Sequence, residues 1–233
     1  MSAYGSMKRS TADGSPLPTK LWPVKPASDK DHYVTTHHLT LSAARHLEGL
    51  LDHLNALFAK EVDDGLTYPQ EGDIDRSAFE DYFFSADVFV GIVGGTGQLD
   101  RREGEIEIDV DTARSGRSWD ECVAGFYYIK PNYPGRSSHI CNAGFVVPPI
   151  HRGKGYGSVL AKSYVDHAPR LGYQASVFNL VYVNNFASIK LWERLNFTKA
   201  GLIPRAGRLK RRDGQGEEYV DAFVFYKSFI EKD

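Results

Sequence analysis

The pattern of apolar and polar positions predicts several elements in the first half of the chain. Leucines and a phenylalanine recur at three- and four-residue spacing between Leu39 and Phe58, which predicts an amphipathic helix over residues 42–60. A second helix is expected over residues 77–84. The run Asp-Val-Phe-Val-Gly-Ile-Val at 87–93 is typical of a buried strand.

The second half of the chain alternates between strand and helix patterns. Apolar runs predict strands at 123–129 and 140–147, and the turn-forming residues at 131–135 indicate that these strands pair antiparallel. The remaining predicted elements are a helix through 160–171 that ends at Gly172, a strand at 176–183, a helix at 187–195, and a final strand pair at 197–202 and 219–226.

Two polar stretches lack this periodicity. Residues 1–30 are polar and rich in turn-forming residues, so a disordered arm is expected there. Residues 95–120 begin with a glycine run and have few apolar positions, which predicts a polar insertion. The chain from 31 to 233 is interpreted as a single domain.

Charge and composition exclude some function classes. The 233 residues include 28 Lys and Arg against 30 Asp and Glu, so the formal charge of −2 provides no overall positive field for nucleic acid or an anionic membrane. The two cysteines, Cys122 and Cys141, are too few for a disulfide framework. No apolar run reaches membrane-spanning length. We therefore expect a cytoplasmic protein, with mitochondria as an additional location, and no nucleic-acid or membrane partner.

One glycine-rich segment lies between a predicted strand and a predicted helix. In Arg152-Gly153-Lys154-Gly155-Tyr156-Gly157, the glycines leave backbone N–H groups accessible, and the helix that follows contributes its positive dipole end. A pyrophosphate group fits such a loop. A dinucleotide fold is disfavoured because the next strand ends without a carboxylate, and a P-loop because no Gly-Lys-Ser/Thr ending follows.

Two sequence blocks carry a family resemblance. Arg152-x-x-Gly155-x-Gly157 resembles the acetyl-CoA pyrophosphate signature of the GNAT superfamily, and Asn185-x-Ala187-x-x-x-Leu191-Trp192-x-x-x-Asn196-Phe197 resembles its next block. A narrower similarity, to the fungal L-azetidine-2-carboxylate acetyltransferases, extends over roughly residues 65–228. The segments that carry it are 67–70, 126–133, 141–145, 178–181 and 201–207.

The resemblance implies a fold and an activity. The fold would be α/β, with a mixed, mostly antiparallel sheet whose central strands, at 140 and 176, splay apart around the pantetheine arm and are flanked by helices. The activity would be N-acetylation of small proline-like imino acids, such as azetidine-2-carboxylate and cis-4-hydroxyproline, with acetyl-CoA as cosubstrate. A homodimer is also implied, as are roles in proline-analogue detoxification and oxidative stress.

The resemblance also assigns roles to single residues. Asn185 is the catalytic candidate, while Asn142 and the backbone amides of Asn179 and Leu180 would hold the carboxylate and ring of the acceptor. The expected acetyl-CoA contacts are Phe145, Val147, Arg152, Gly153, Lys154, Gly155, Gly157, Ser158 and Asn185. No metal site is expected.

Alternatives remain open at these positions. Asn185 is also a candidate N-cap for the helix near Ala187, and Asn179 a candidate site of a bulge. Trp192 stands where the superfamily often has a tyrosine acid, and indole cannot protonate a thiolate. The base is unassigned, with His139 or water as candidates. The alternative functions are acetylation of another small amine or amino acid, and a non-catalytic acetyl-CoA-binding module.

Overall fold

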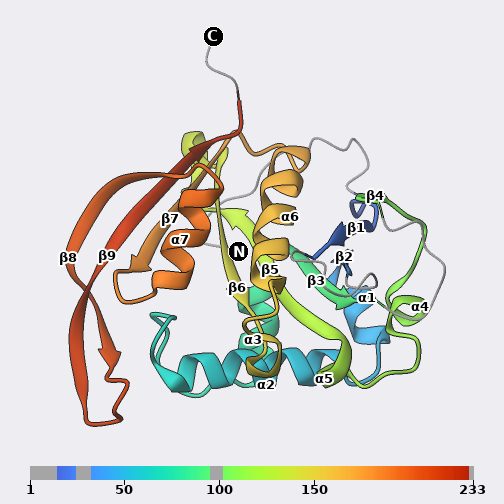
Figure 1. Cartoon of the computed structure of the whole chain (residues 1–233), viewed down its shortest axis with the longest axis horizontal. Helices are drawn as coiled ribbons and strands as arrows, with labels where there is room; N and C mark the ends of the chain where they lie inside the picture. The colour runs from blue at the N-terminus through green and yellow to red at the C-terminus, as the bar shows by residue number, and fades with distance from the viewer. Residues whose placement is uncertain (1–14, 25–32, 95–101, 231–233) are drawn as a thin grey trace.

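The computed structural model describes residues 15–24, 33–94 and 102–230, which form a mixed sheet with helices on both faces (Figure 1). The sheet has nine strands in the order β4-β1-β2-β3-β5-β6-β7-β9-β8. The strands are β1 (Lys20–Pro23), β2 (Tyr33–Leu39), β3 (Asp87–Val93), β4 (Gly104–Glu105), β5 (Val123–Pro131), β6 (Ile140–Val146), β7 (Ala175–Tyr182), β8 (Thr198–Lys210) and β9 (Glu217–Ser228).

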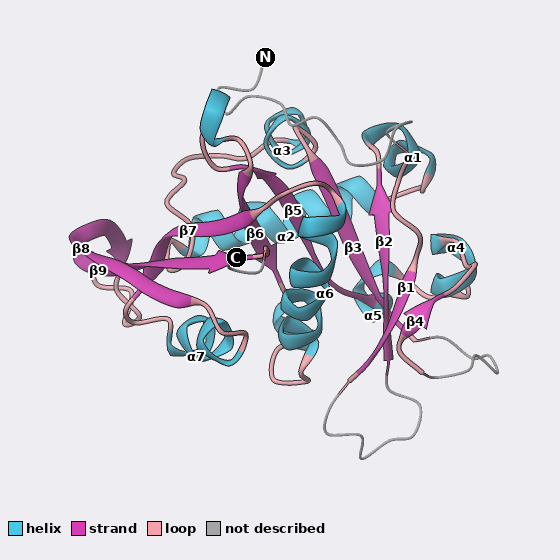
Figure 2. Ribbon diagram, turned by 90° about the horizontal axis from the view of Figure 1, so that it is seen from above, coloured by secondary structure: helices cyan, strands magenta, loops and turns pink. Residues whose placement is uncertain are grey.

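The helices divide between the two faces. They are α1 (Leu41–His46), α2 (Leu50–Asp64), α3 (Arg76–Phe83), α4 (Val110–Arg114), α5 (Trp119–Cys122), α6 (Tyr156–Arg170) and α7 (Phe186–Arg194), with 3₁₀ turns at Gly135–Ser137 and Pro149–His151. Helices α1 to α3 pack on one face, and α6 and α7 pack on the other (Figure 2). No helix in the described ranges is long and apolar enough to cross a membrane.

The centre of the sheet is split between β6 and β7. These two strands run parallel, and their register is limited to Ile140 opposite Ala175 and Cys141 opposite Ser176. The other neighbouring strands pair antiparallel. The predicted mixed sheet with splayed central strands is therefore confirmed, and the split opens toward the carboxyl ends of β6 and β7.

The helix predicted over 42–60 is two helices. Helix α1 ends at His46, and α2 begins after Gly49, whose φ of +75° is in the left-handed region that favours glycine. The Trp119 indole N–H donates to the Glu48 carbonyl at 2.9 Å. A tertiary contact thus stabilises the break, and the leucine spacing alone did not indicate it.

The disordered arm predicted over 1–30 is wrong where the structure describes it. Residues 20–23 form β1, which pairs with β2, and Leu21 and Trp22 are buried. Residues 1–14 and 25–30 lie outside the described residues. Strand β1 was missed because it is short and lies between polar segments.

The stretch predicted as a polar insertion, 95–120, contains ordered elements. Residues 95–101 lie outside the described part of the chain, but β4, α4 and the start of α5 lie within it. Asp109 caps α4 by accepting from the Thr112 amide at 2.7 Å. Val110 and Ala113 are buried against the core. Two apolar anchors are enough here because α4 packs against β3.

Candidate active site

A small cavity lies where β6 and β7 separate. Its volume is about 250 Å³, below the roughly 300–1,000 Å³ typical of sites for drug-sized ligands. The lining residues come from the α2–α3 loop, α3, β5, β6, β7 and α7. They are Thr67, Tyr68, Pro69, Tyr82, Tyr128, Asn142, Ala143, Gly144, Phe145, Phe178, Asn179, Leu180, Val181, Tyr182, Asn185, Ser188 and Trp192. None of these lining residues carries a charge at neutral pH.

Three asparagines form a hydrogen-bonded triad at the narrow end of the split. The Asn132 side-chain oxygen accepts from Asn142 Nδ2 at 2.6 Å and from Asn179 Nδ2 at 2.6 Å. Asn132 Nδ2 in turn donates to Asn179 Oδ1 at 3.1 Å. Asn142 Oδ1 is buried and has no hydrogen-bond partner among the described residues. Because buried polar atoms are rarely left unpaired, this oxygen is an acceptor available to a ligand.

Strand β7 has a bulge at Asn179, a member of the asparagine triad. Its register with β9 stops at Phe178 and resumes at Val181, so Asn179 and Leu180 have no partner in that ladder. The predicted bulge at Asn179 is therefore present. Both residues line the cavity, as does Asn142.

Asn185 lies at the opposite end of the cavity, where it caps α7. Its Oδ1 accepts from the Ser188 amide at 3.2 Å, so the predicted N-cap is present. The other side-chain group, Nδ2, is a donor, and the residue lines the cavity. The Trp192 indole N–H is bonded to Ser188 Oγ at 3.0 Å.

The α2–α3 loop, residues 65–75, forms one wall of the cavity. The Tyr68 hydroxyl donates to the Phe145 carbonyl at 3.0 Å and thereby satisfies a carbonyl of β6 near the split. Burial raises the pKa of Tyr68 well above its usual value, so the hydroxyl stays protonated and remains a donor.

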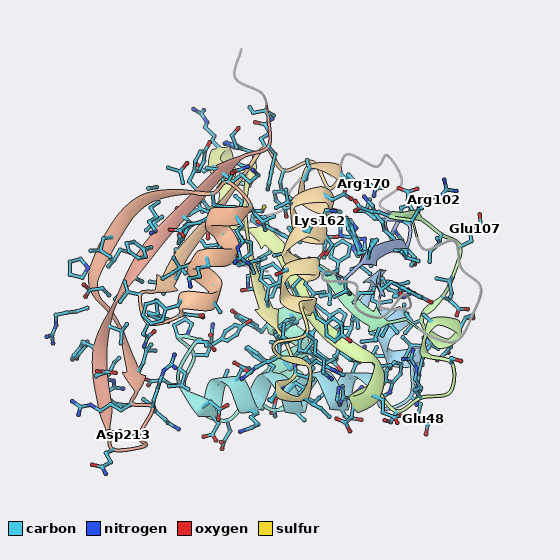
Figure 3. The ribbon with its side chains drawn as sticks, in the orientation of Figure 1. Glu48, Arg102, Glu107, Lys162, Arg170 and Asp213 are labelled. Atoms are coloured by element: carbon cyan, nitrogen blue, oxygen red, sulfur yellow. The ribbon has the colours of Figure 1, made fainter. Side chains whose placement is uncertain are left out.

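The loop is attached to the β8–β9 hairpin. The Lys210 amide donates to the Gly65 carbonyl at 2.9 Å, and Arg208 pairs with Glu71 at 2.9 Å. Figure 3 shows Asp213 at the tip of this hairpin, away from the sheet. The end of the hairpin next to its turn therefore holds the loop that forms this cavity wall.

The glycine loop lies apart from the cavity, at the start of α6. Gly153 and Gly155 have φ of +79° and +85°, and Gly155 provides no side chain to cap the helix. A Cβ built on Gly153 would meet nothing within 4 Å, and one on Gly157 would only touch Val147 at 3.8 Å. The loop is therefore open, with N–H groups of the first turn available for an anion.

The flanking cations of this loop differ in their contacts. The Arg152 guanidinium pairs with Glu61 on α2 and donates to the Val147 carbonyl. Lys154 and Ser158 are exposed. Arg152 is thus held at the rim by α2, and Lys154 is the more accessible charge.

The structure separates the predicted site residues into two groups. Asn142, Phe145, Asn179, Leu180 and Asn185 meet in the cavity. The second group lies between the end of β6 and the first turn of α6, and its members do not line the cavity. They are Val147, Arg152, Gly153, Lys154, Gly155, Gly157 and Ser158. An extended cosubstrate with its phosphates at the loop and its reactive end at the cavity would span both.

Two other candidates are placed outside the reacting region. His139 does not line the cavity, and its ring hydrogen-bonds the Arg136 carbonyl at 3.1 Å. Cys141 is buried, and burial raises the pKa of its thiol to about 12. The suggestion of His139 as base is therefore not supported, and Cys141 is a core residue.

Comparisons with known proteins agree with this architecture. Residues 102–197 match the Acetyltransferase (GNAT) family. The chain is 44% identical over 182 residues to the N-acetyltransferase aca1 of Schizosaccharomyces pombe, covering 78% of this chain and 81% of that protein. The chain belongs to the GNAT family of acetyltransferases. As a GNAT protein, it is an N-acetyltransferase, not a non-catalytic binding module, and acetyl-CoA is its cosubstrate.

Other relatives of this GNAT chain are more distant. It is 30% identical over 205 residues to Protein SPT10 of Saccharomyces cerevisiae, but spans 31% of that protein. A GCN5-related N-acetyltransferase from Kribbella flavida superposes with a TM-score of 0.62 at 22% identity, covering 84% of this chain and 97% of the other. A phosphinothricin acetyltransferase from Sinorhizobium meliloti, in complex with acetyl-CoA, superposes with a TM-score of 0.56 at 16% identity. The match covers 76% of this chain and 82% of the other.

Three residues at or beside the cavity of this GNAT chain were given no role from the sequence. Asn132, which belongs to the triad but does not line the cavity, was placed among turn-forming residues, Tyr82 in a predicted helix and Tyr128 in a predicted strand. The alternation along 123–131 places Tyr128 and Lys130 on one face of the strand, and this signal was available. What the sequence did not indicate was that α3 brings Tyr82 to the same place.

Proposed function

We propose that this GNAT enzyme acetylates the ring nitrogen of small proline-like imino acids, with azetidine-2-carboxylate and cis-4-hydroxyproline as acceptors. The observation that carries the proposal is the small, uncharged cavity in which Asn142 Oδ1 is a buried acceptor that no described residue of the chain hydrogen-bonds. The narrower sequence resemblance over 65–228 points to the same acceptors.

The roles within the cavity follow from which groups are already bonded. Asn142 Nδ2 donates to Asn132, whereas Asn142 Oδ1 is buried and has no partner among the described residues, and an oxygen repels a carboxylate and accepts from an N–H. We therefore assign Asn142 to the acceptor nitrogen, and the amides of Asn179 and Leu180 to the acceptor carboxylate. This differs from the sequence expectation, in which Asn142 held the carboxylate.

The proposed chemistry is direct acyl transfer. A deprotonated secondary amine has one N–H and one lone pair, so donating the N–H to Asn142 leaves the lone pair to attack the acetyl carbonyl carbon. The C–N bond forms, the C–S bond breaks, coenzyme A leaves as its thiolate, and the nitrogen loses its remaining proton to solvent. We place Asn185 Nδ2 and the Phe145 amide at the thioester, where donors stabilise developing negative charge.

The proposed cosubstrate contacts are the open loop and its flanks. The N–H groups from Gly153 to Gly157 would hold the pyrophosphate, with Lys154 adding charge from the rim, while the Ser158 N–H already donates to the Gly155 carbonyl at 3.0 Å. Arg152 contributes there only if it exchanges Glu61 for a phosphate oxygen. Val147 lies between the loop and the cavity and would contact the pantetheine arm.

The first test is an acceptor panel. Release of free thiol from acetyl-CoA is measured with azetidine-2-carboxylate, cis-4-hydroxyproline, proline, spermidine and a peptide amine. We expect selective release with the first two acceptors. Preferential turnover of spermidine or of the peptide would overturn the imino-acid assignment and leave a GNAT enzyme for another amine, which is the second candidate.

Asn142→Ala tests the proposed contact to nitrogen. Loss of a buried hydrogen bond should raise the KM for the imino acid by about tenfold, consistent with roughly 1–3 kcal/mol for leaving a buried partner unpaired. The affinity for acetyl-CoA, measured by calorimetry, should stay within about twofold. Asn184→Ala is the matched control, since Asn184 is outside the triad. An unchanged KM in Asn142→Ala would remove Asn142 from the acceptor site.

A further inference from the structure

A buried lysine packs against two rings of the acceptor cavity. Lys130 on β5 is only 7% exposed, and its Nζ lies 4.1 Å from the ring centroid of Tyr82 and 4.1 Å from that of Tyr128. Both rings line the cavity, and their hydroxyls are 3.0 Å apart. We call these two tyrosines the ring wall.

Lys130 is also the cross-strand neighbour of Asn142. The two residues are directly opposite in the antiparallel register of β5 and β6. Side chains of such a pair leave the sheet on the same face, with Cβ atoms about 4.5–5.5 Å apart. The ammonium group is therefore close to the proposed acceptor site, although it does not line the cavity.

The charge of Lys130 contrasts with the neutral cavity. Two aromatic faces stabilise a cation by their quadrupoles. Burial lowers the pKa of Lys130 to about 8, so the amine is mostly protonated at neutral pH. A buried charge is screened by salt much less than an exposed one, so its field extends into the cavity.

We propose that Lys130 determines the acceptor class, because its positive charge beside the ring wall favours acceptors that carry a carboxylate and disfavours cationic amines. An amino or imino acid has a net charge of zero as the zwitterion and of −1 once the nitrogen is deprotonated. The same field therefore also favours the reactive, deprotonated form. The inference rests on the proposed function, and it names the part of the protein that would select an acid over an amine.

The test compares an acid with its amide. For the wild type, kcat/KM is measured with azetidine-2-carboxylate and with azetidine-2-carboxamide, and the ratio of the two values is the readout. Lys130→Met, which keeps the length and removes the charge, should lower this ratio about tenfold, the size expected for a unit charge acting across the ring wall at moderate effective dielectric. Lys130→Arg, which keeps the positive charge, should keep most of the wild-type ratio.

Lys199→Met is the matched control. Lys199 also lies over a ring, 4.5 Å from the Phe223 centroid, but on β8 and outside the cavity. Its substitution should leave the acid-to-amide ratio at the wild-type value. Each variant is also checked by thermal unfolding and acetyl-CoA affinity. If Lys130→Met does not fold, Lys130→Gln takes its place.

The possible outcomes separate this inference from the proposed function. If the wild type rejects imino acids but accepts another amino acid, the substrate proposal fails, and the ratio is measured with that acid and its amide. A ratio that stays unchanged in Lys130→Met, or a wild type with no preference for the acid, overturns the inference about Lys130. The inference is supported if the ratio falls tenfold in Lys130→Met and stays near the wild-type value in Lys130→Arg.

Discussion

Asn185 carries two side-chain groups with different tasks. Its oxygen caps α7, and its NH₂ group is the donor that we place at the thioester. The two tasks can be separated because aspartate is a good N-cap and has no NH₂ group.

Asn185→Asp is the corresponding substitution. The melting temperature should stay close to that of the wild type because the cap is retained. By contrast, kcat should fall by about 10²-fold, in the range for loss of one oxyanion-type donor. Measurement of kcat by thiol release and of melting by calorimetry checks both parts. Asn184→Ala should change neither quantity, and full activity in Asn185→Asp would reduce Asn185 to a cap.

At the scale of elements, the α2–α3 loop and the β8–β9 hairpin act as one unit. The loop provides Thr67, Tyr68 and Pro69 to the cavity, and the hairpin holds it through Arg208 and Lys210. The hairpin therefore influences acceptor binding without lining the cavity.

Arg208→Ala should loosen this wall. We expect the acceptor KM to rise about two- to fivefold, a small effect because exposed ion pairs contribute little. The acetyl-CoA affinity should not change. Arg211→Ala is the control, because it removes the same charge from the same hairpin near its tip. An equal effect of both substitutions would indicate a general charge effect and not attachment of the loop.

Several elements were predictable because the chain itself determines them. Strand β3 was predicted to the residue, and α3 to within one residue, because an unbroken apolar run and a clear helical stretch need no partner to be recognised. The break at Gly49 and strand β1 depend on Trp119 and on β2, which are distant in sequence. The asparagine triad was only partly predicted, since β5, β6 and β7 bring its members together.

At the scale of the whole molecule, two buried histidines should make stability depend on pH. Burial lowers the pKa of His37 to about 4 and that of His167 to about 3. Both are near 6.5 in the unfolded chain. Below pH 6.5 the unfolded state binds protons that the folded state does not, so stability is lost as the pH falls.

Urea unfolding between pH 7.5 and 4.5 measures this dependence. Each histidine should cost roughly 2–3 kcal/mol of unfolding free energy by pH 4.5. His167→Gln, which removes one of the two groups, should reduce the slope in this window by about one proton. A stability that is constant from pH 7 to pH 5 would contradict the predicted shifts.

The homodimer stays a prediction, which sedimentation in solution can check.

The split between β6 and β7 also has a mechanical consequence. Besides two register pairs and the asparagine triad, the halves of the sheet are joined across it by contacts between rings, such as Phe145 against Trp192 at 5.5 Å and Tyr164 against Phe178 at 5.7 Å. Attraction between apolar surfaces weakens on cooling, whereas the flanking ladders of main-chain bonds do not depend on it in the same way. The seam between the two halves is therefore the part of this sheet most sensitive to cold.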